Sequence, residues 1–462
     1  MILLILFTFL ALMASGVTPL PTIAPELVPI RPPNVDRAGL VNITPSTILS
    51  MHYGLNNSQV ANVTLHLDHP GIMLETVPDA VTVQCSNELI TITFSSPESF
   101  ERSKVEWPGK EEFVLITNHQ GDCDAQNERG IFVANSLTWD NATMQVIANA
   151  ERKDIHSAAS ALEVDFSHLA AKHPYKRDIT FQKDGLNMAG DISLPHDMKI
   201  FSVDPIFTAT ATKADLSDNI TFSGYMKYHI HNNHLESMYF DFDASLTADL
   251  GFNFDFTAPF DRNLTFSPDA LQLSTINIPK IMQLGPSLRW AIGVEVGASM
   301  TISVGTNVWA QIPDGHLHLD LVDSTQTHAE GWTPEHNITL GDVSRTLMLS
   351  ASPFVDFSAE LAVRVLGGKL DLSAGFMAQT KYVNELSFTK VMVIPIHPGS
   401  GDEQNTTMAL RSPDQVAPSG MNCESGIEHH TAVDFSVTAF LTEKWEKELF
   451  SYETAVSDTC YH

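Results

Sequence analysis

The stretch FDFDASLTADLGFNFDFTA, from Phe240 to Ala258, decides the fold class. Every even position in it is apolar, and every odd position is polar or glycine. Successive side chains of a β-strand point to opposite faces, so a period of two predicts a strand with one apolar face, which a helix of 3.6 residues per turn does not produce. We expect a mainly β protein, in which an antiparallel sheet covers this face by packing against a second sheet or by curling on itself.

Two further stretches repeat the alternation. Leu288 to Ile312 keeps its apolar residues on even positions for 25 residues. Leu347 to Val365 keeps them on odd positions, and after Gly367 and Gly368 the chain returns with the same alternation through Leu370 to Ala378. The sequence therefore predicts a domain of long strands, with a hairpin turn at the two glycines.

The length of the second stretch limits how it can fold. A straight strand of 25 residues would span about 80 Å, whereas a compact unit of about 200 residues has a radius of gyration of about 16–17 Å. The strands are expected to bend, to break, or to build an elongated, curved sheet. The polar-face glycines Gly293, Gly297 and Gly305 are the expected bulge sites, and Pro313-Asp314-Gly315 is the expected turn into the next strand.

A small β-rich domain with one helix is predicted before the long strands. Val81–Cys85 and Leu89–Phe94 alternate around a polar turn and predict a hairpin. Ser96 is placed to cap a helix that has Pro97 at its first position and ends near Trp107. Three further strands are expected over Glu112–Thr117, Gly130–Ser136 and Met144–Ala150.

Composition divides the chain into seven segments. They are a signal peptide (1–16), a Pro-rich, poorly packed arm (17–41), the N-terminal domain (42–150), a polar linker (151–190), the long-strand domain (191–394), a low-complexity linker (395–422) and a Cys-tethered C-terminal segment (423–462). The first linker is expected to hold a helix around Ile155–Leu169. The last segment is expected to hold a strand over Val433–Ala439 and a short charged helix around Thr442–Leu449.

The first residues predict secretion. Ile2 to Met13 is apolar apart from Thr8, too short to span a bilayer, and followed by small residues at Ala14–Gly16. No later run predicts a membrane span. Lys plus Arg number 26 and Asp plus Glu number 55, so the formal charge is 26 − 55 = −29. Such a protein lacks the cationic surface that nucleic acids select and is repelled by anionic lipids.

Other residues suit an extracellular glycoprotein. Local pairing is expected for the four cysteines, Cys85 with Cys123 and Cys423 with Cys460. Lys176-Arg177 is either a dibasic processing site or two solvated cations. Eight Asn-x-Ser/Thr sequons are candidate glycosylation sites: Asn42, Asn56, Asn62, Asn141, Asn219, Asn263, Asn337 and Asn405.

Histidines supply the candidate metal ligands. His229 and His231 point to one face of a strand, and His234 can reach back from a turn, so the three imidazoles can hold Zn²⁺ or Cu²⁺. The alternative is a polar strand face that ends in a turn. His316 and His318 form a similar pair with no third ligand adjacent.

Carboxylates and aromatic rings are the other candidates. Asp241 and Asp243 share a strand face at about 6–7 Å, a separation used by acid/base pairs in glycoside hydrolysis, although a solvated strand face has the same pattern. Three tryptophans are candidates for a sugar-stacking platform; Trp290 is in phase with the core, Trp309 is out of phase, and Trp332 is the third.

Part of the chain resembles uncharacterised secreted fungal two-domain proteins. The first resemblance, from Leu74 to Ala150, is to a small Cys-paired domain of unknown function, and its matching elements are Val83-Gln84-Cys85, the Ser96-Pro97 helix ending at Trp107-Pro108, Phe113–Thr117, Cys123 and Ser136–Trp139. The second is to the β-rich domain of unknown function that accompanies it, through Leu284–Leu288, Ile312–Gly315 and Leu319–Ser324. This family implies no catalytic residue.

No catalytic motif stands out, and no cofactor is implied. The favoured interpretation is a non-enzymatic extracellular or cell-wall-associated binding protein, whose partner is a cell-wall glycan or an apolar small molecule. The alternative is a carbohydrate-active hydrolase that uses carboxylates on the sheet face. An apolar guest would be lined by the phenylalanines at 252, 254 and 256, whereas a sandwich with a dry core would bury them against the opposing sheet.

Overall fold

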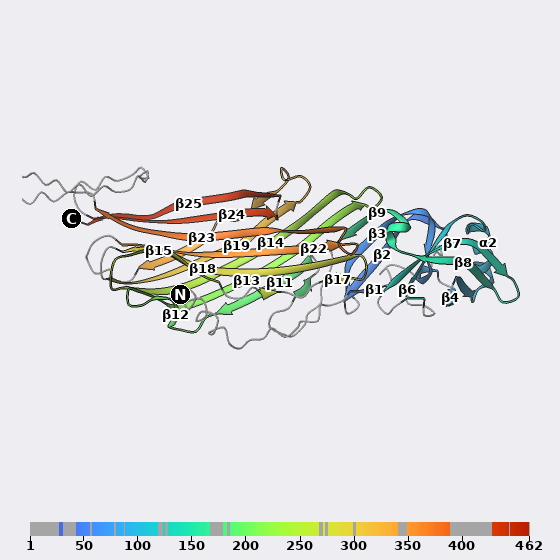
Figure 1. Ribbon diagram of the computed structural model, residues 1–462, viewed down its shortest axis with the longest axis horizontal. Coiled ribbons are helices and arrows are strands. Elements are labelled where there is room, and N and C mark those ends of the chain that lie inside the picture. Colours follow the sequence, from blue (N-terminus) through green and yellow to red (C-terminus); the bar gives the residue numbers. More distant parts are fainter. Residues whose placement is uncertain are drawn as a thin grey trace, which may run out of the picture.

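Figure 1 shows the computed structural model, an elongated molecule whose longest strands run along its long axis. The structure describes residues 27–30, 43–55, 58–77, 80–86, 88–118, 123–124, 128–166, 179–182, 185–267, 271–272, 276–298, 302–340, 349–388, 427–442 and 444–461. These residues form two large sheets, which are antiparallel apart from the short parallel pair β3–β6. The predicted mainly β, sandwich-like fold is confirmed.

The larger sheet has 17 strands and continues from the N-terminal region into the long-strand region. Its strands are β1 (Val28–Ile30), β2 (Ser46–Leu55), β3 (Ser58–Met73), β4 (Ala80–Ser86), β5 (Leu89–Phe94), β6 (Phe113–Asn118), β7 (Arg129–Asp140), β8 (Gln145–Lys153), β9 (Ala159–Asp165), β10 (Ile179–Gln182), β11 (Gly185–Ser193), β12 (Met198–Val203), β13 (Phe207–His229), β14 (His234–Phe256), β19 (Ile302–Asp320), β20 (His328–Glu330) and β21 (Glu335–Leu340).

The smaller sheet has eight strands. They are β15 (Phe260–Phe266), β16 (Leu271–Gln272), β17 (Ile276–Ile278), β18 (Met282–Ala298), β22 (Leu349–Val365), β23 (Leu370–Phe388), β24 (Ile427–Leu441) and β25 (Trp445–Tyr461). Two 3₁₀ turns, η1 (Leu74–Thr76) and η2 (Ile155–Ser157), and the helix α2 (Pro97–Glu106) complete the described elements.

The apolar faces of the long strands meet between the two sheets. The ring of Phe242 on β14 contacts that of Phe376 on β23 at 5.4 Å between centroids. Trp290 on β18 is buried, as its phase predicts, and its Nε1 donates across the core to Asp218 Oδ2 on β13 at 3.1 Å. Two cavities between the sheets measure only about 30 and 20 Å³. The sandwich is thus filled by its own side chains at these positions.

The long stretch from Leu288 to Ile312 breaks into two strands. β18 ends at Ala298 and β19 begins at Ile302, and the two belong to different sheets. The expected bulges at the glycines are wrong, because pairing runs through Gly293, Gly297 and Gly305 with no register shift. Gly293 instead leaves room for a ring, since a Cβ there would lie 1.9 Å from Cζ of Phe354.

The turn expected at Pro313-Asp314-Gly315 is also wrong, because β19 continues to Asp320. The residues form an irregularity in the pairing: Ala244 and Leu246, two apart on β14, lie opposite Gly315 and Ile312, three apart on β19. The extra residue moves the buried face of β19 from even to odd positions. This is why Leu317 and Leu319 remain in the core.

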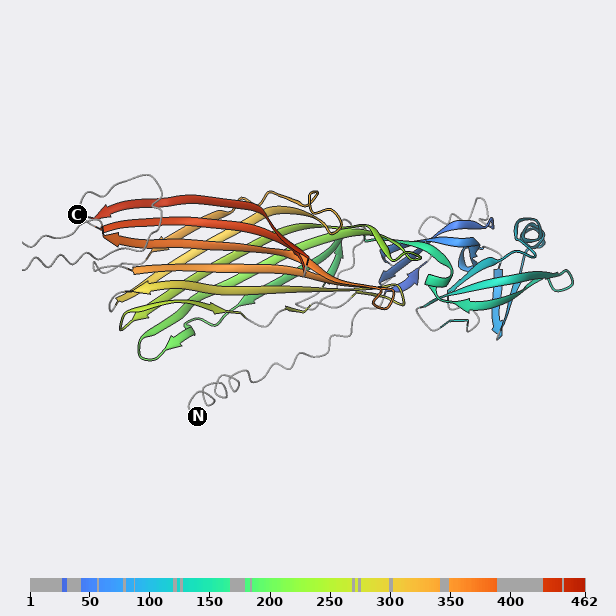
Figure 2. The same ribbon diagram turned by 45° about the horizontal axis from the view of Figure 1, so that its top comes forward.

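Two predicted helices are replaced mainly by strands. Of the helix expected around Ile155–Leu169, Ile155–Ser157 forms the 3₁₀ turn η2, and residues 167–169 lie outside the described residues. Ala159–Asp165 forms β9, which pairs with β3 on one side and β13 on the other (Figure 2). Trp445–Tyr461 forms β25, which pairs with β24 along its length. In both cases pairing with a neighbouring strand outweighs the helix propensity of Ala, Leu, Glu and Lys.

The N-terminal region follows its predictions closely. β4 and β5 form the expected hairpin, and β6, β7 and β8 are the three expected strands. Ser96 caps α2 by accepting a hydrogen bond from the Ser99 amide, and Pro97 is its first residue. The arm is better packed than expected where it is described, because Leu27 is fully buried and β1 pairs with β2.

A buried ion pair ties this region together. The side chains of Arg129 and Glu75 are 2% and 3% exposed, and their ion pair measures 2.5 Å. Arg129 also donates to the carbonyls of His52 on β2 and Ile30 on β1, and its guanidinium lies 4.8 Å from the centre of the Tyr53 ring. Asn118 donates to the other Glu75 oxygen. The charges are therefore compensated by partners from several separate segments.

Candidate functional site

A row of four rings crosses the outer face of the larger sheet. It consists of Tyr225 on β13, Tyr239 on β14, His318 on β19 and His328 on β20, and we call it the ring row. Successive ring centres lie 5.8, 5.2 and 5.3 Å apart. Pairing puts Tyr225 opposite Tyr239 and His318 opposite His328, and the tyrosines and His318 are half-buried while His328 is exposed. Four adjacent strands thus present contiguous rings to solvent.

Carboxylates border the ring row on the same face. Asp165 lies opposite Tyr225 on the neighbouring strand β9, and Asp241 Oδ1 lies 2.6 Å from His318 Nδ1. Burial, reinforced by the charge of Glu163 and a hydrogen bond to it, raises the pKa of Tyr225 to about 12. Burial also raises the pKa of Tyr239, with the Asp241 and Asp165 charges adding to the effect. Both phenols are therefore neutral hydroxyls at ordinary pH.

The predicted carboxylate pair lies beside the ring row. Asp241 and Asp243 are on the outer face, as the alternation predicts, and each contacts a different histidine: Asp241 contacts His318, and Asp243 Oδ1 lies 2.8 Å from His316 Nδ1. The two carboxylates thus belong to a ladder of His–Asp contacts across β14 and β19. They lie on a strand face and not among the residues that line the cavities described here.

The three histidines of the candidate metal site contact different partners. His229 contacts Glu236, and His231 Nε2 lies 3.2 Å from Asp68 on β3. His234 stacks on His229 with ring centres 6.1 Å apart. Within the described part of the chain, no group of three His, Cys, Asp or Glu side chains is placed to hold a metal ion.

The tryptophans do not form one platform. Trp290 and Trp332 are buried between the sheets, where Trp332 donates from Nε1 to the carbonyl of His316. Trp309 is half-buried on the outer face, opposite Asp249 on β14 and Asn337 on β21. Stacking surface on this sheet is thus provided by the ring row, with Trp309 standing apart on β19.

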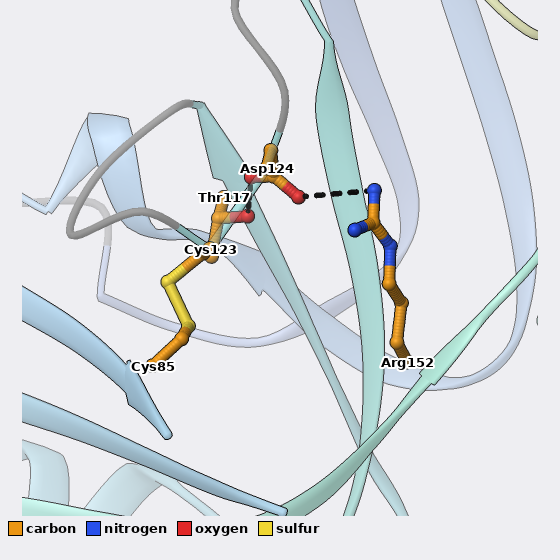
Figure 3. The surroundings of a disulfide bond; sticks show 5 residues. All are labelled: Cys85, Thr117, Cys123, Asp124 and Arg152. Carbon is orange, nitrogen blue, oxygen red and sulfur yellow. Dashed lines mark hydrogen bonds and ion pairs between the residues drawn. A yellow bond between two sulfur atoms is a disulfide. The ribbon is translucent and has the colours of Figure 1, made fainter. Parts of the chain in front are cut away.

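The predicted disulfide between Cys85 and Cys123 is present, with 5.0 Å between Cα atoms (Figure 3). The residue after Cys123 is Asp124, whose fully buried side chain accepts a hydrogen bond from Thr117 Oγ1 and lies 3.6 Å from Arg152. Gly130 makes this arrangement possible, since a Cβ there would lie 1.7 Å from Asp124 Oδ1. The disulfide therefore holds a segment that helps to position Arg152.

Replacing Cys85 and Cys123 by serine should lower the free energy of unfolding by about 3–4 kcal/mol, because the closed loop no longer restricts the unfolded chain. The sequence separation that sets this figure is 38 residues. Urea unfolding followed by circular dichroism, compared with the wild-type protein, measures the change. An unchanged unfolding midpoint would show that the crosslink contributes nothing to stability.

The remaining candidate residues are partly described. Asn141, Asn219, Asn263 and Asn337 are exposed, whereas Asn62 is half-buried with its Oδ1 inaccessible. Asn42, Asn56 and Asn405, the dibasic pair Lys176-Arg177, the predicted signal peptide (1–16) and the predicted linker (395–422) lie outside the described residues. Cys423 does as well, so its pairing with Cys460 on β25 stays a prediction. The division into domains also stays a prediction.

Comparison with known proteins identifies one segment. Residues 64–163 match the family described as Domain of unknown function (DUF7029). The match includes the whole Leu74–Ala150 segment and confirms that this segment resembles a domain of unknown function, but it assigns no role to any residue. No curated protein and no solved structure matches the chain. No helix in the described ranges is long and apolar enough to cross a membrane.

The sequence carries one signal for the ring row, in the position of its two tyrosines. Tyr225 and Tyr239 are aromatic residues on the otherwise polar face of their strands. The residues on either side of each tyrosine in the sequence are buried. An aromatic residue on a polar strand face is a candidate for binding, whereas one on the apolar face is usually part of the core. Of the candidate metal pair His316 and His318, the structure places His318 in the ring row.

Proposed function

We propose that this protein is a non-enzymatic extracellular binding protein whose ring row stacks on a neutral or amino-containing glycan. The observation that carries the proposal is the contiguous series of rings from Tyr225 to His328, with centres 5–6 Å apart on four adjacent strands. The apolar faces of sugar rings can pack on such side chains, which combine large contact area with a polar atom for hydrogen bonding.

The polar groups beside the rings support a sugar ligand. Carboxylates such as Asp241 and Asp165 are acceptors for hydroxyl groups, and hydrogen bonds to an ionised acceptor are stronger than neutral ones. The neutral tyrosine hydroxyls can donate as well as accept. The formal charge of −29 disfavours anionic polysaccharides and favours neutral or cationic ones.

Secretion and glycosylation belong to the same proposal. They are supported by the apolar stretch Ile2–Met13 followed by small residues, by the disulfide, and by four exposed sequons. The hydrolase alternative has less support, because Asp241 and Asp243 each contact a histidine on a strand face. We therefore propose no catalytic role for them.

The test is a depletion assay with purified protein and insoluble chitin, β-1,3-glucan and cellulose. Wild-type protein should bind at least one of them saturably. Replacing both Tyr225 and Tyr239 by alanine should weaken that binding about 5- to 150-fold, if each ring contributes about 0.5–1.5 kcal/mol. The midpoint of thermal unfolding reports whether the variant still folds, since losing one cross-strand pair costs only about 0.2–1 kcal/mol.

Trp309→Ala is the matched control, because Trp309 is an outer-face aromatic residue on the same strand as His318. They are nine positions apart in the sequence, which corresponds to about 30 Å along a strand. Its affinity should equal that of the wild-type protein. If no polysaccharide binds saturably, or if Trp309→Ala loses as much affinity as the tyrosine pair, the ring row is not a glycan site.

A further inference from the structure

A cleft lies where the N-terminal strands meet the turns of the long-strand region. Its volume is about 290 Å³. Apolar side chains line part of it, including Met51 on β2, Ile155 on η2 and Ile281 before β18. The first two come from the N-terminal side and the third from the other region. We call it the junction cleft, and its size is at the lower end of the range for small-molecule pockets.

Cations outnumber carboxylates among the side chains that line the junction cleft, and each of these cations also pairs with a carboxylate beside the cleft. Four cations line it, against one carboxylate, Asp154; the cations are Arg129, Arg152, Lys153 and Lys280. In the whole chain, Asp and Glu outnumber Lys and Arg by 55 to 26. A cleft that concentrates one sign of charge raises the local concentration of the opposite ion. The cations of the lining therefore provide partners for an anion at this point of an acidic protein, in competition with the carboxylates that pair with them.

Neighbouring carboxylates position the cations without using all of their hydrogen-bonding capacity. Glu128 Oε2 lies 2.5 Å from Lys280 Nζ and 3.6 Å from a terminal nitrogen of Arg152, and Asp124 is also 3.6 Å from Arg152. Contacts of 3.6 Å are ion pairs but not hydrogen bonds. The Arg152 side chain is 46% exposed, so its fork of donors remains open to a ligand carboxylate.

Two backbone features and one orphaned atom occur at the same place. Lys280 has φ 63° and Leu366 has φ 47°, both in the left-handed region that non-glycine residues rarely adopt, and both line the junction cleft. The Leu366 amide donates to the carbonyl of Ile281, which joins the two turns. Arg129 Nε is buried and has no hydrogen-bond partner among the described residues. Unusual backbone and unsatisfied polar atoms concentrate at binding sites.

We propose that the junction cleft binds a small organic acid, with one carboxylate held by Arg152 and Lys280 and an apolar body of one or two rings against Met51, Ile155 and Ile281. The cations favour ligands that carry a negative charge, and the apolar lining favours ligands that have an apolar body. The site is separate from the ring row, so it can be tested independently of glycan binding.

The probe is 8-anilinonaphthalene-1-sulfonate, an apolar body with one anionic group, titrated into the full chain and followed by fluorescence. We expect saturable binding that 1-naphthoate displaces and that 1-naphthalenemethanol, the uncharged analogue, does not. Arg152→Gln with Lys280→Gln should weaken binding about ten- to a hundredfold, as expected when charge-assisted hydrogen bonds are lost. Both side chains are about half exposed, but Arg152 is also the cation beside the fully buried Asp124, so the midpoint of thermal unfolding is measured for this variant and binding is compared only at temperatures at which it is folded.

Lys213→Gln is the matched control, because Lys213 is a partly exposed lysine that pairs with Asp249 in the long-strand region. It should bind like the wild-type protein. A salt titration of the wild-type protein needs no variant. Rising salt should weaken the binding of the probe, because it screens the attraction between opposite charges. The proposal fails if binding is not saturable, if the uncharged analogue displaces the probe as well as naphthoate does, or if the Arg152/Lys280 variant binds like the control.

Discussion

Replacing Arg129 by alanine should lower the free energy of unfolding by about 3–5 kcal/mol, because the change leaves the buried carboxylate of Glu75 without its cation. The Glu75 side chain is 3% exposed, so water cannot replace the lost guanidinium. The same change removes the donors to the carbonyls of His52 and Ile30, which attach β2 and β1 to the rest of the region. Equilibrium unfolding in urea measures the loss.

Two further variants separate the buried charge from a general effect of removing arginine. Arg102→Ala breaks a pair with Glu106 on the surface of α2, which should cost only about 0.3–0.5 kcal/mol. Arg129→Met combined with Glu75→Leu should recover part of the stability lost in Arg129→Ala, because neither buried charge remains. A loss below 1 kcal/mol in Arg129→Ala would contradict the burial of this pair.

Phe254→Asp should prevent folding at neutral pH. Phe254 is completely buried, with 0% solvent exposure. Its ring centre lies 5.7 Å from that of Phe252 and 6.5 Å from that of Phe207. Losing the ring costs about 3–5 kcal/mol, and burying an unpaired carboxylate costs several more. Together these approach the 5–15 kcal/mol that holds a typical domain together.

Circular dichroism and size-exclusion chromatography test this result against Asn253→Asp, the control on the exposed face of the same strand. The control should fold and change stability by less than about 0.5 kcal/mol. If Phe254→Asp folds and melts like the control, the even face of β14 is not in the core. The Phe254→Asp variant thus distinguishes the packed sandwich from an open sheet that holds an apolar guest.

The alternation of the sequence predicts the strands and their buried faces, but not their partners. β18 and β19 share one phase from Leu288 to Ile312, yet they lie in different sheets. A period of two specifies which face of a strand is buried, and either sheet of a sandwich satisfies that requirement. The hairpin turn at Gly367 and Gly368 is predictable, because alternating strands lie on both sides of it in the sequence. The φ values of the two glycines, 68° and 102°, are ones that favour glycine.

Short elements were less predictable than long ones. Ala159–Asp165 contains good helix-forming residues, and only the edges of β3 and β13 make it a strand. The candidate sites depend even more on pairing. Tyr225 and His328 are far apart in the sequence, and they join one row only because register shifts at Lys227/Tyr228 and Ala244/Leu246 set the alignment of β13, β14 and β19. Sequence spacing carries no information on such shifts.

The shared strand β9 also determines how the molecule would carry a mechanical load. It hydrogen-bonds to β3 from Asn62 to Leu67 and to β13 from Tyr225 to His229, and the long strands run along the longest axis (Figure 1). Bonds between antiparallel strands are perpendicular to the strand direction. A pull along the long axis would therefore shear these bonds together instead of opening them one at a time. Tension between the two ends of the molecule would be resisted by a whole ladder of bonds at once.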